Sequence, residues 1–149
     1  MTSSELRVVS ASREVSAGAS EIFEVIADPS RQPEFDGNDN LATAAVGQRV
    51  CSVGDVFAVT LTEGAVRENH VVEFDEGRLI AWKPAKQGGV PIGHLWRWEL
   101  TPLGASRSLV VRTYDWSELF DESRLPRARA TTTERLGASI DGLGKLFER

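Results

Sequence analysis

The side chains most suited to chemistry in this chain are two histidines and the carboxylates near them. Glu68 and His70 are separated by one residue, while His94 and Asp115 flank a longer segment. Histidine titrates close to neutral pH and a carboxylate can orient its ring, so these residue types suit proton transfer at an enolisable or hydroxyl-bearing substrate. His70, His94 and Asp115 are therefore the candidate catalytic residues. Their spacing matches no catalytic motif, which leaves the orientation of a bound ligand as the alternative role.

Tryptophans accompany the second histidine on an alternating segment. His94, Trp96 and Trp98 fall on one face of residues 93–100, which is the period-two pattern of a half-buried strand. An aromatic wall with a few polar groups is typical of a small-molecule site. The alternative is that the same tryptophans fill a solid core.

The elements that position these residues are predicted from turn residues and alternation. Short apolar segments separated by Gly, Pro and Asp predict an antiparallel meander after an N-terminal strand, with the segment 41–46 as an exposed edge. Pro84 is expected to end its strand, and the glycines of 85–92 predict a mobile loop. The predicted strands span 6–15, 41–46, 56–62, 66–74, 79–83, 93–100 and 109–116.

Helical patterns occur near both ends of the chain. Residues 20–28 predict a short amphipathic helix, and 30–35 a further helical turn. The longest predicted helix spans 124–149, and small or polar residues interrupt its apolar stripe, which predicts space beneath it. Its basic residues are predicted to form a solvated face, with Arg129 nearest to a cavity. Those basic residues are Arg124, Arg127, Arg129 and Arg135.

The inward faces follow from placing the more charged alternation of each strand in solvent. Under this rule Glu68, His70, Trp82 and the aromatic face at 94–98 point inward. On the last strand Leu109, Val111, Thr113 and Asp115 also point inward. The rule places Arg67, Asn69, Glu73, Lys83, Arg97, Glu99 and Arg112 outward.

Composition bounds the class of protein. A length of 149 residues predicts one domain over 1–149, and the net charge of -5 argues against a general nucleic-acid role. The single cysteine excludes an internal disulfide, and neither a secretory signal nor an apolar run suited to membrane insertion is evident. We therefore expect a cytoplasmic monomer or homodimer. With no metal-ligand spacing and no dinucleotide or phosphate-loop motif, we expect neither a metal nor a cofactor.

Three phrases resemble one known family. ASEIFEVIADPSRQPEFDG resembles its first helix pair, VVEFDEGRLIAW its central hairpin, and HLWRWELTPLGASRSLVVRTYDW its last hairpin. The chain thus resembles the START-like helix-grip superfamily (SRPBCC), which includes polyketide cyclase/dehydratase-like and lipid-transfer proteins. The resemblance implies an α+β helix-grip fold, in which about seven curved antiparallel strands wrap around a long C-terminal helix, with two short helices after the first strand and a cavity between sheet and helix.

The resulting hypothesis is a protein that binds a small hydrophobic, aromatic or polycyclic ligand in that cavity. The alternatives are a polyketide cyclase/dehydratase-like enzyme using the same cavity, and an interaction module whose core is filled. The predicted ligand-binding residues are Glu68, His70, Trp82, His94, Trp96, Trp98, Asp115, Thr132, Leu136 and Ile140.

Overall fold

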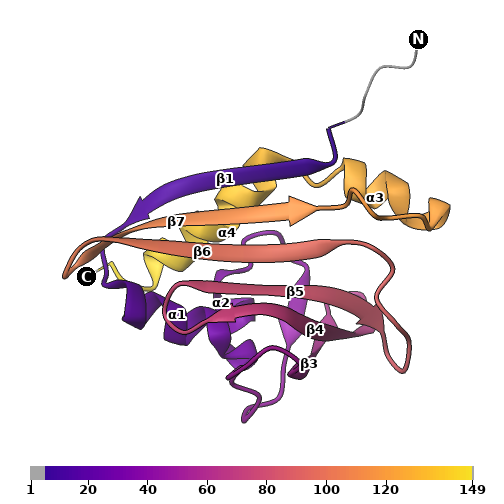
Figure 1. Cartoon of the computed structure of the whole chain (residues 1–149), viewed down its shortest axis with the longest axis horizontal. Coiled ribbons are helices and arrows are strands. Elements are labelled where there is room, and N and C mark those ends of the chain that lie inside the picture. Colours follow the sequence, from indigo (N-terminus) through magenta and orange to yellow (C-terminus); the bar gives the residue numbers. More distant parts are fainter. Residues whose placement is uncertain (1–5, 149) are drawn as a thin grey trace.

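Seven antiparallel strands form one curved sheet in the computed structural model, which describes residues 6–148 (Figure 1). The spatial order is β1-β7-β6-β5-β4-β3-β2, so the last six strands form a meander and β1 closes the far edge beside β7. The strands are β1 (Val8–Val15), β2 (Leu41–Thr43), β3 (Val56–Leu61), β4 (Val66–Asp75), β5 (Leu79–Lys86), β6 (Leu95–Gly104) and β7 (Arg107–Asp115). This arrangement confirms the predicted meander and the edge position of the segment that begins at Leu41.

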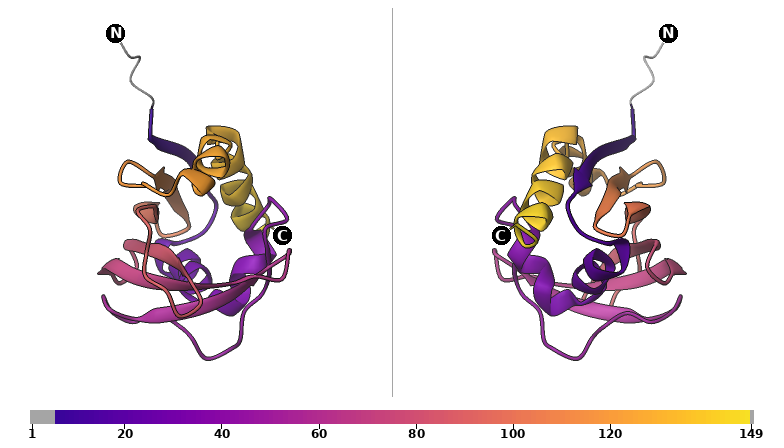
Figure 2. Two further views of the ribbon diagram at one scale, coloured as in Figure 1. Left: turned by 90° about the vertical axis from the view of Figure 1, so that its right-hand side faces the viewer. Right: turned by 90° about the vertical axis from the view of Figure 1, so that its left-hand side faces the viewer.

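Helices cover the concave face of the sheet, and this confirms the helix-grip prediction (Figure 2). The C-terminal helix α4 packs against β1, β7 and α2. None of the helices within residues 6–148 has the length and apolar character needed to span a membrane. The helical elements are α1 (Ala19–Ala27), η1 (Pro29–Arg31), α2 (Gln32–Phe35), η2 (Glu122–Arg124), α3 (Leu125–Arg129) and α4 (Thr133–Lys145).

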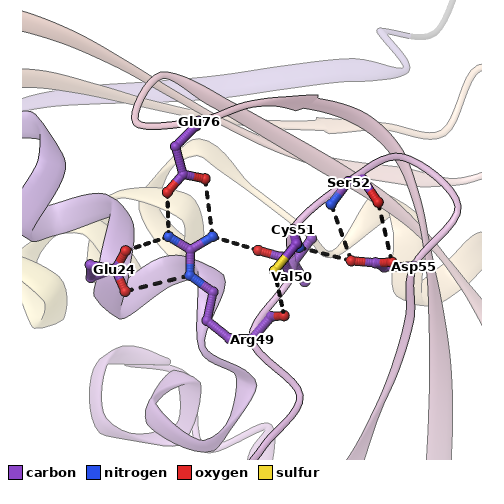
Figure 3. Close-up of polar contacts among 7 residues, drawn as sticks. All are labelled: Glu24, Arg49, Val50, Cys51, Ser52, Asp55 and Glu76. Atoms are coloured by element: carbon purple, nitrogen blue, oxygen red, sulfur yellow. Dashed lines mark hydrogen bonds and ion pairs between the residues drawn. The ribbon is translucent and has the colours of Figure 1, made fainter.

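An arginine joins three segments at the α1 side of the sheet (Figure 3). The Arg49 guanidinium donates to the Glu24 carboxylate on α1. It also donates two hydrogen bonds, of 2.6 and 3.1 Å, to the carboxylate of Glu76, which lies in the turn after β4. It also donates to the carbonyl oxygen of Val50. These bonds attach α1 and the 44–55 segment to the end of the sheet.

The predicted continuous helix over 124–149 is wrong, because the helix is interrupted between α3 and α4. Thr132 has an extended backbone, with φ -102° and ψ 166°, and its hydroxyl accepts a hydrogen bond from the Arg135 N–H at 3.3 Å. A threonine in this conformation caps a new helix. The Thr131 hydroxyl meanwhile donates to the Arg127 carbonyl at 3.1 Å. Residues 130–132 therefore separate α3 and α4 into two helices.

Two strand boundaries also differ from prediction. β5 continues through Pro84 to Lys86, so the turn region begins later than predicted. Proline is tolerated because β6 pairs only with residues 79–82 of β5, which makes Pro84 part of a local edge. β2 ends at Thr43, since beyond it the Gln48 side-chain amide bonds both backbone groups of Ala58 on β3, at 2.7 and 3.0 Å.

The predicted faces of β4 and β7 are inverted over most of their length. β6 does point Trp96 and Trp98 inward, and the hairpin register places Tyr114 opposite Trp96 and Arg112 opposite Trp98. Directly opposed residues share a face, so β7 turns Arg112 and Tyr114 inward. On β4 the residues Arg67, Asn69 and Val71 face inward, until a register shift between Val71 and Glu73 brings Phe74 to the core side.

The small residues of α4 permit close packing rather than leaving space. A side chain at Gly142 would place its Cβ 2.8 Å from the carbonyl oxygen of Phe35, so α2 approaches the helix at this point. Beneath them Phe35 meets Trp98 edge to face, with ring centroids 5.7 Å apart, and Ile140 and Leu143 have no exposed surface. This part of the concave face is filled.

Candidate functional site

A cavity of about 390 Å³ occupies the other part of the concave face, between the sheet and the segment that carries η2, α3 and the start of α4. Its volume falls in the range of small-molecule sites. Trp82, Trp96 and Leu136 supply apolar wall, and Pro84 and His94 line it at the ends of β5 and β6. These strand ends and α3 lie at the same end of the molecule, on the right in Figure 1.

The aromatic wall is held by contacts between rings. Trp96 packs on Tyr114 with centroids 4.2 Å apart and planes at 34°, while Trp82 meets Phe57 edge to face at 5.2 Å. β5, β6 and β7 present these rings side by side because Trp82 pairs with Trp96, and Trp96 with Tyr114. The wall is therefore built into the sheet register.

His94 and Tyr114 form a hydrogen-bonded pair in the cavity, with Nδ1 and Oη 2.9 Å apart. Burial, followed by repulsion from Arg124 and Arg67, lowers the pKa of His94 from 6.5 to about 4. Burial raises the pKa of Tyr114 to about 12, against a smaller opposing effect of Arg127 and Arg124. At neutral pH the imidazole is thus uncharged and the phenol keeps its proton, so the pair can both accept and donate a hydrogen bond to a ligand.

Arg112 places a cation at the inner end of the cavity. Its guanidinium lies 4.6 and 4.9 Å from the ring centroids of Trp96 and Trp98, and Nη1 donates to the Ser139 hydroxyl of α4. Nε is buried and has no hydrogen-bond partner within residues 6–148. Burial lowers the pKa of Arg112 to about 10, and only Asp36 opposes this shift. The side chain is positioned mainly by aromatic stacking.

The loop after α2 forms the opposite rim. The Asp36 carboxylate accepts the backbone N–H groups of Asn40 and Leu41 at 2.6 and 3.1 Å, which folds the loop back on itself. The Asn38 amide donates to the Arg135 carbonyl at 2.9 Å and to Ser139 Oγ at 3.2 Å. The loop is thereby fixed to α4, and its polar side chains line the cavity.

Arginines surround the mouth. Arg124, Arg127 and Arg135 line the cavity from the helical segment, and Arg67 lines it from β4. Arg127, Arg129 and Arg135 are exposed, in agreement with the predicted solvated basic face, whereas Arg124 is half-buried. The prediction that Arg129 lies nearest to the cavity is wrong, because the other three line the cavity and Arg129 does not.

Four predicted site residues come together in the cavity: Trp82, His94, Trp96 and Leu136. Two others, Trp98 and Ile140, do not line the cavity and belong to the filled core instead. Thr132 is exposed and serves as the cap of α4. The three residues predicted from the apolar stripe of the C-terminal helix thus have different positions: Leu136 lines the cavity, Ile140 lies in the core and Thr132 caps α4.

The inverted faces remove three predicted residues from the cavity. The Glu68 carboxylate accepts the Gly88 N–H at 2.7 Å and so fixes the β5–β6 connection. His70 lies on the outer face of β4, in register with Lys83. Asp115 accepts the N–H and hydroxyl of Ser117 at 2.9 and 2.6 Å where β7 ends. None of the three lines the cavity.

Arg67, Asn69, Arg112 and Tyr114 line the cavity although the face assignment excluded the first three and left Tyr114 outward. The hairpin turn at 105–106 pairs Gly104 with Arg107, and this register continued unchanged would set Trp98 opposite Thr113 and Trp96 opposite Asp115. A register shift between Pro102 and Gly104 instead sets the tryptophans opposite Arg112 and Tyr114. On β4 the register shift after Val71 has the same effect, so alternation alone gives no signal for the inward residues of either strand.

No group of three His, Cys, Asp or Glu side chains within residues 6–148 is arranged to hold a metal ion. The chemistry that the cavity offers is therefore that of its aromatic rings, its His94–Tyr114 pair and its arginines.

Residues 7–148 match the family described as polyketide cyclase/dehydrase and lipid transport, and the chain belongs to this family. A relative of Mycobacterium tuberculosis, the uncharacterized protein Rv0088, is 30% identical over 119 residues. That match covers 72% of this chain and 47% of the relative, so the chain spans about half the length of the curated relatives it matches.

Solved structures share the fold at low sequence identity. The Zhui aromatase/cyclase from Streptomyces sp. R1128 has a TM-score of 0.68 at 17% identity, covering 94% of this chain and 92% of that chain. Norcoclaurine synthase from Thalictrum flavum, solved in complex with dopamine and hydroxybenzaldehyde, has a TM-score of 0.62 at 18% identity, covering 93% of this chain and 84% of that one. Both establish the architecture of the sheet and helices.

Proposed function

We propose that the protein binds a small, largely aromatic ligand in the cavity between the sheet and the α3–α4 segment. The observation that carries this proposal is the hollow of about 390 Å³ walled by Trp82, Trp96 and Tyr114. Flat rings supply apolar contact area, and the few polar groups fix orientation. The family description includes lipid transport, and one structural neighbour was solved with small aromatic molecules, both of which agree with this role.

Tryptophan fluorescence tests the proposal, because Trp82 and Trp96 line the cavity. Native mass spectrometry for a co-purifying molecule, followed by titration with a panel of apolar aromatic compounds, should give a bound mass or a saturable quench. Ala128→Phe enlarges a buried lining residue of α3 and should weaken binding at least about tenfold. The matched control Ala105→Phe lies on an exposed turn and should bind as the unmodified protein does. Saturable binding that Ala128→Phe leaves unchanged would place the ligand elsewhere and contradict the proposal.

The second candidate is a cyclase/dehydratase-like enzyme, and the His94–Tyr114 pair is the observation that favours it. A neutral imidazole beside a protonated phenol supplies a proton acceptor and a donor within 2.9 Å of each other. Turnover of a polyketide-like substrate should then be lost in His94→Gln and Tyr114→Phe while ligand binding changes only a few-fold. His70→Gln is the matched control, since His70 lies outside the cavity. Equal effects of both histidine variants would contradict the enzyme hypothesis.

A further inference from the structure

The charge of the cavity is opposite to that of the chain. The sequence has 22 acidic and 17 basic residues, excluding histidine, and a net charge of -5. Among the residues that line the cavity there are five arginines and a single carboxylate, that of Asp36. A lining drawn evenly from this composition would be slightly acidic. Arginine has therefore been concentrated at this site.

The lining arginines are poorly neutralised. Within residues 6–148, Arg127 forms an ion pair with Glu63 at 3.8 Å, whereas no carboxylate lies within ion-pair distance of Arg67, Arg112, Arg124 or Arg135. The Asp36 carboxylate raises the pKa of Arg112, but it is bound by the Asn40 and Leu41 N–H groups and forms no ion pair with an arginine of residues 6–148. Guanidinium groups that share a cavity without counter-ions repel one another, and an anion would offset that cost.

Three of these residues, Arg67, Arg124 and Arg127, form what we call the arginine cluster, at the mouth of the cavity. They interact electrostatically: burial first, then repulsion from Arg124 and Arg127, lowers the pKa of Arg67, and only Glu63 opposes these effects. The cluster also acts on the polar pair, since Arg124 and Arg67 lower the pKa of His94. The arginine cluster and the aromatic wall therefore border the same space.

We infer that the ligand is an organic acid, whose apolar aromatic body lies on the wall of Trp82, Trp96 and Tyr114 and whose anionic group is bound by the arginine cluster. The inference rests on the proposed binding function and adds the chemical class of the ligand. Guanidinium binds carboxylate, sulfonate or phosphate oxygens through paired N–H groups, so the shared feature is the anion rather than one acid. The cluster has three guanidinium groups against the single carboxylate of Glu63, so its remaining positive charge would also attract such ligands toward the mouth.

Two dyes with the same aromatic body test this. 8-Anilinonaphthalene-1-sulfonate carries an anionic group, N-phenyl-1-naphthylamine lacks it, and both become fluorescent in apolar surroundings. We expect the anionic dye to bind at least about tenfold tighter, with an affinity that falls as salt is added. Equal or tighter binding of the neutral dye would overturn the inference while leaving the proposed binding function intact. If neither dye binds, the proposed function itself fails for ligands of this size.

Substitutions in the arginine cluster test whether the anionic group of the dye binds there. Arg67→Gln and Arg124→Gln should each weaken the sulfonate dye about tenfold and leave the neutral dye within about twofold. Arg78→Gln removes the same charge at an exposed position outside the cavity and is the matched control. If the cluster variants behave like Arg78→Gln, or if Ala128→Phe does not weaken the sulfonate dye, the dye lies elsewhere and the inference is wrong.

The His94 resonance provides a readout that does not depend on dye fluorescence. An anion at the arginine cluster would offset the repulsion from Arg124 and Arg67, so saturation with the sulfonate dye should raise the pKa of His94 from about 4. Burial by the neutral dye does not offset this repulsion. NMR titration of a His70→Gln protein, which retains one histidine, isolates the signal. A His94 pKa that the sulfonate dye fails to raise above its value with the neutral dye contradicts the inference.

Discussion

The two parts of the concave face are built from the same strands and the same C-terminal segment, yet one is filled and the other hollow. Where α2 and α4 lie on the sheet, the side chains are buried and closely packed. They include Phe35, Trp98, Ile140 and Leu143. Where α3 replaces α4, the sheet presents Trp82 and Trp96 to a cavity. The helix interruption at 130–132 separates the two parts.

The polar groups are distributed in the same unequal way. The filled part accommodates Ser139, whose hydroxyl donates to the Asp36 carbonyl at 2.5 Å and accepts from Asn38 and Arg112. The hollow part holds four arginines that form no ion pair within residues 6–148, and a histidine whose pKa lies well below its ordinary value. Incomplete packing and uncompensated charge lower stability and are expected where a ligand completes the structure.

The largest expected difference between the two parts is in packing. Trp98→Ala removes a side chain that is 1% exposed and should lower the free energy of unfolding by about 4 kcal/mol, whereas Trp96→Ala, at the cavity wall, should cost about 2 kcal/mol. Trp96 loses less because it is only partly buried and part of its surface faces the cavity rather than packed neighbours. Urea unfolding of both variants measures the difference, and equal losses would show that the cavity wall is packed like the core.

Acid should destabilise the hollow part through His94. The pKa of His94 is ordinarily 6.5 and is about 4 in the folded protein, so well above pH 6.5 this residue is unprotonated in both the folded and the unfolded chain. As the pH falls below 6.5, His94 becomes protonated in the unfolded chain but stays neutral in the folded chain. Stability is therefore lost progressively down to about pH 4, by up to about 3 kcal/mol.

The substitution His94→Gln isolates this contribution. The carboxylates titrate alike in both proteins, so only the unmodified protein should show the additional loss between neutral pH and pH 4 in chemical unfolding. If both proteins lose the same free energy over that interval, His94 is protonated normally and the polar pair is more open to water than the structure indicates.

The smallest expected effect is at Arg112, where the two parts meet. Arg112→Met keeps an unbranched side chain beside the tryptophans and removes a desolvated charge that forms no ion pair with residues 6–148. The ligand-free protein should therefore be unchanged or about 1 kcal/mol more stable. Arg112→Ala, which also removes the packing, serves as the control and should be less stable than Arg112→Met. A loss above about 1 kcal/mol in Arg112→Met would mean that the guanidinium supports the filled part.

Local patterns in the sequence determined the elements and much of the aromatic wall. Alternation fixed the inward face of Trp96 and Trp98, and turn residues separated the strands of the meander. The packing of the curved sheet around the C-terminal helix was predicted from the family resemblance. These features were predictable because each depends on residues close together in the chain.

The tertiary structure alone decided which polar residues enter the cavity. Placing charge in solvent is a sound local rule, yet Arg112 lies inside, because Trp96, Trp98 and Ser139 surround its guanidinium from other segments. The β4 register shift and the Thr132 cap likewise place Arg67 and Arg124 at the mouth while removing His70. Strand register is set by the pairing of one strand with the next, and a shift of one residue exchanges the two faces of a strand. The sequence therefore indicated a cavity with an aromatic wall, and only the folded chain showed that the cavity is basic.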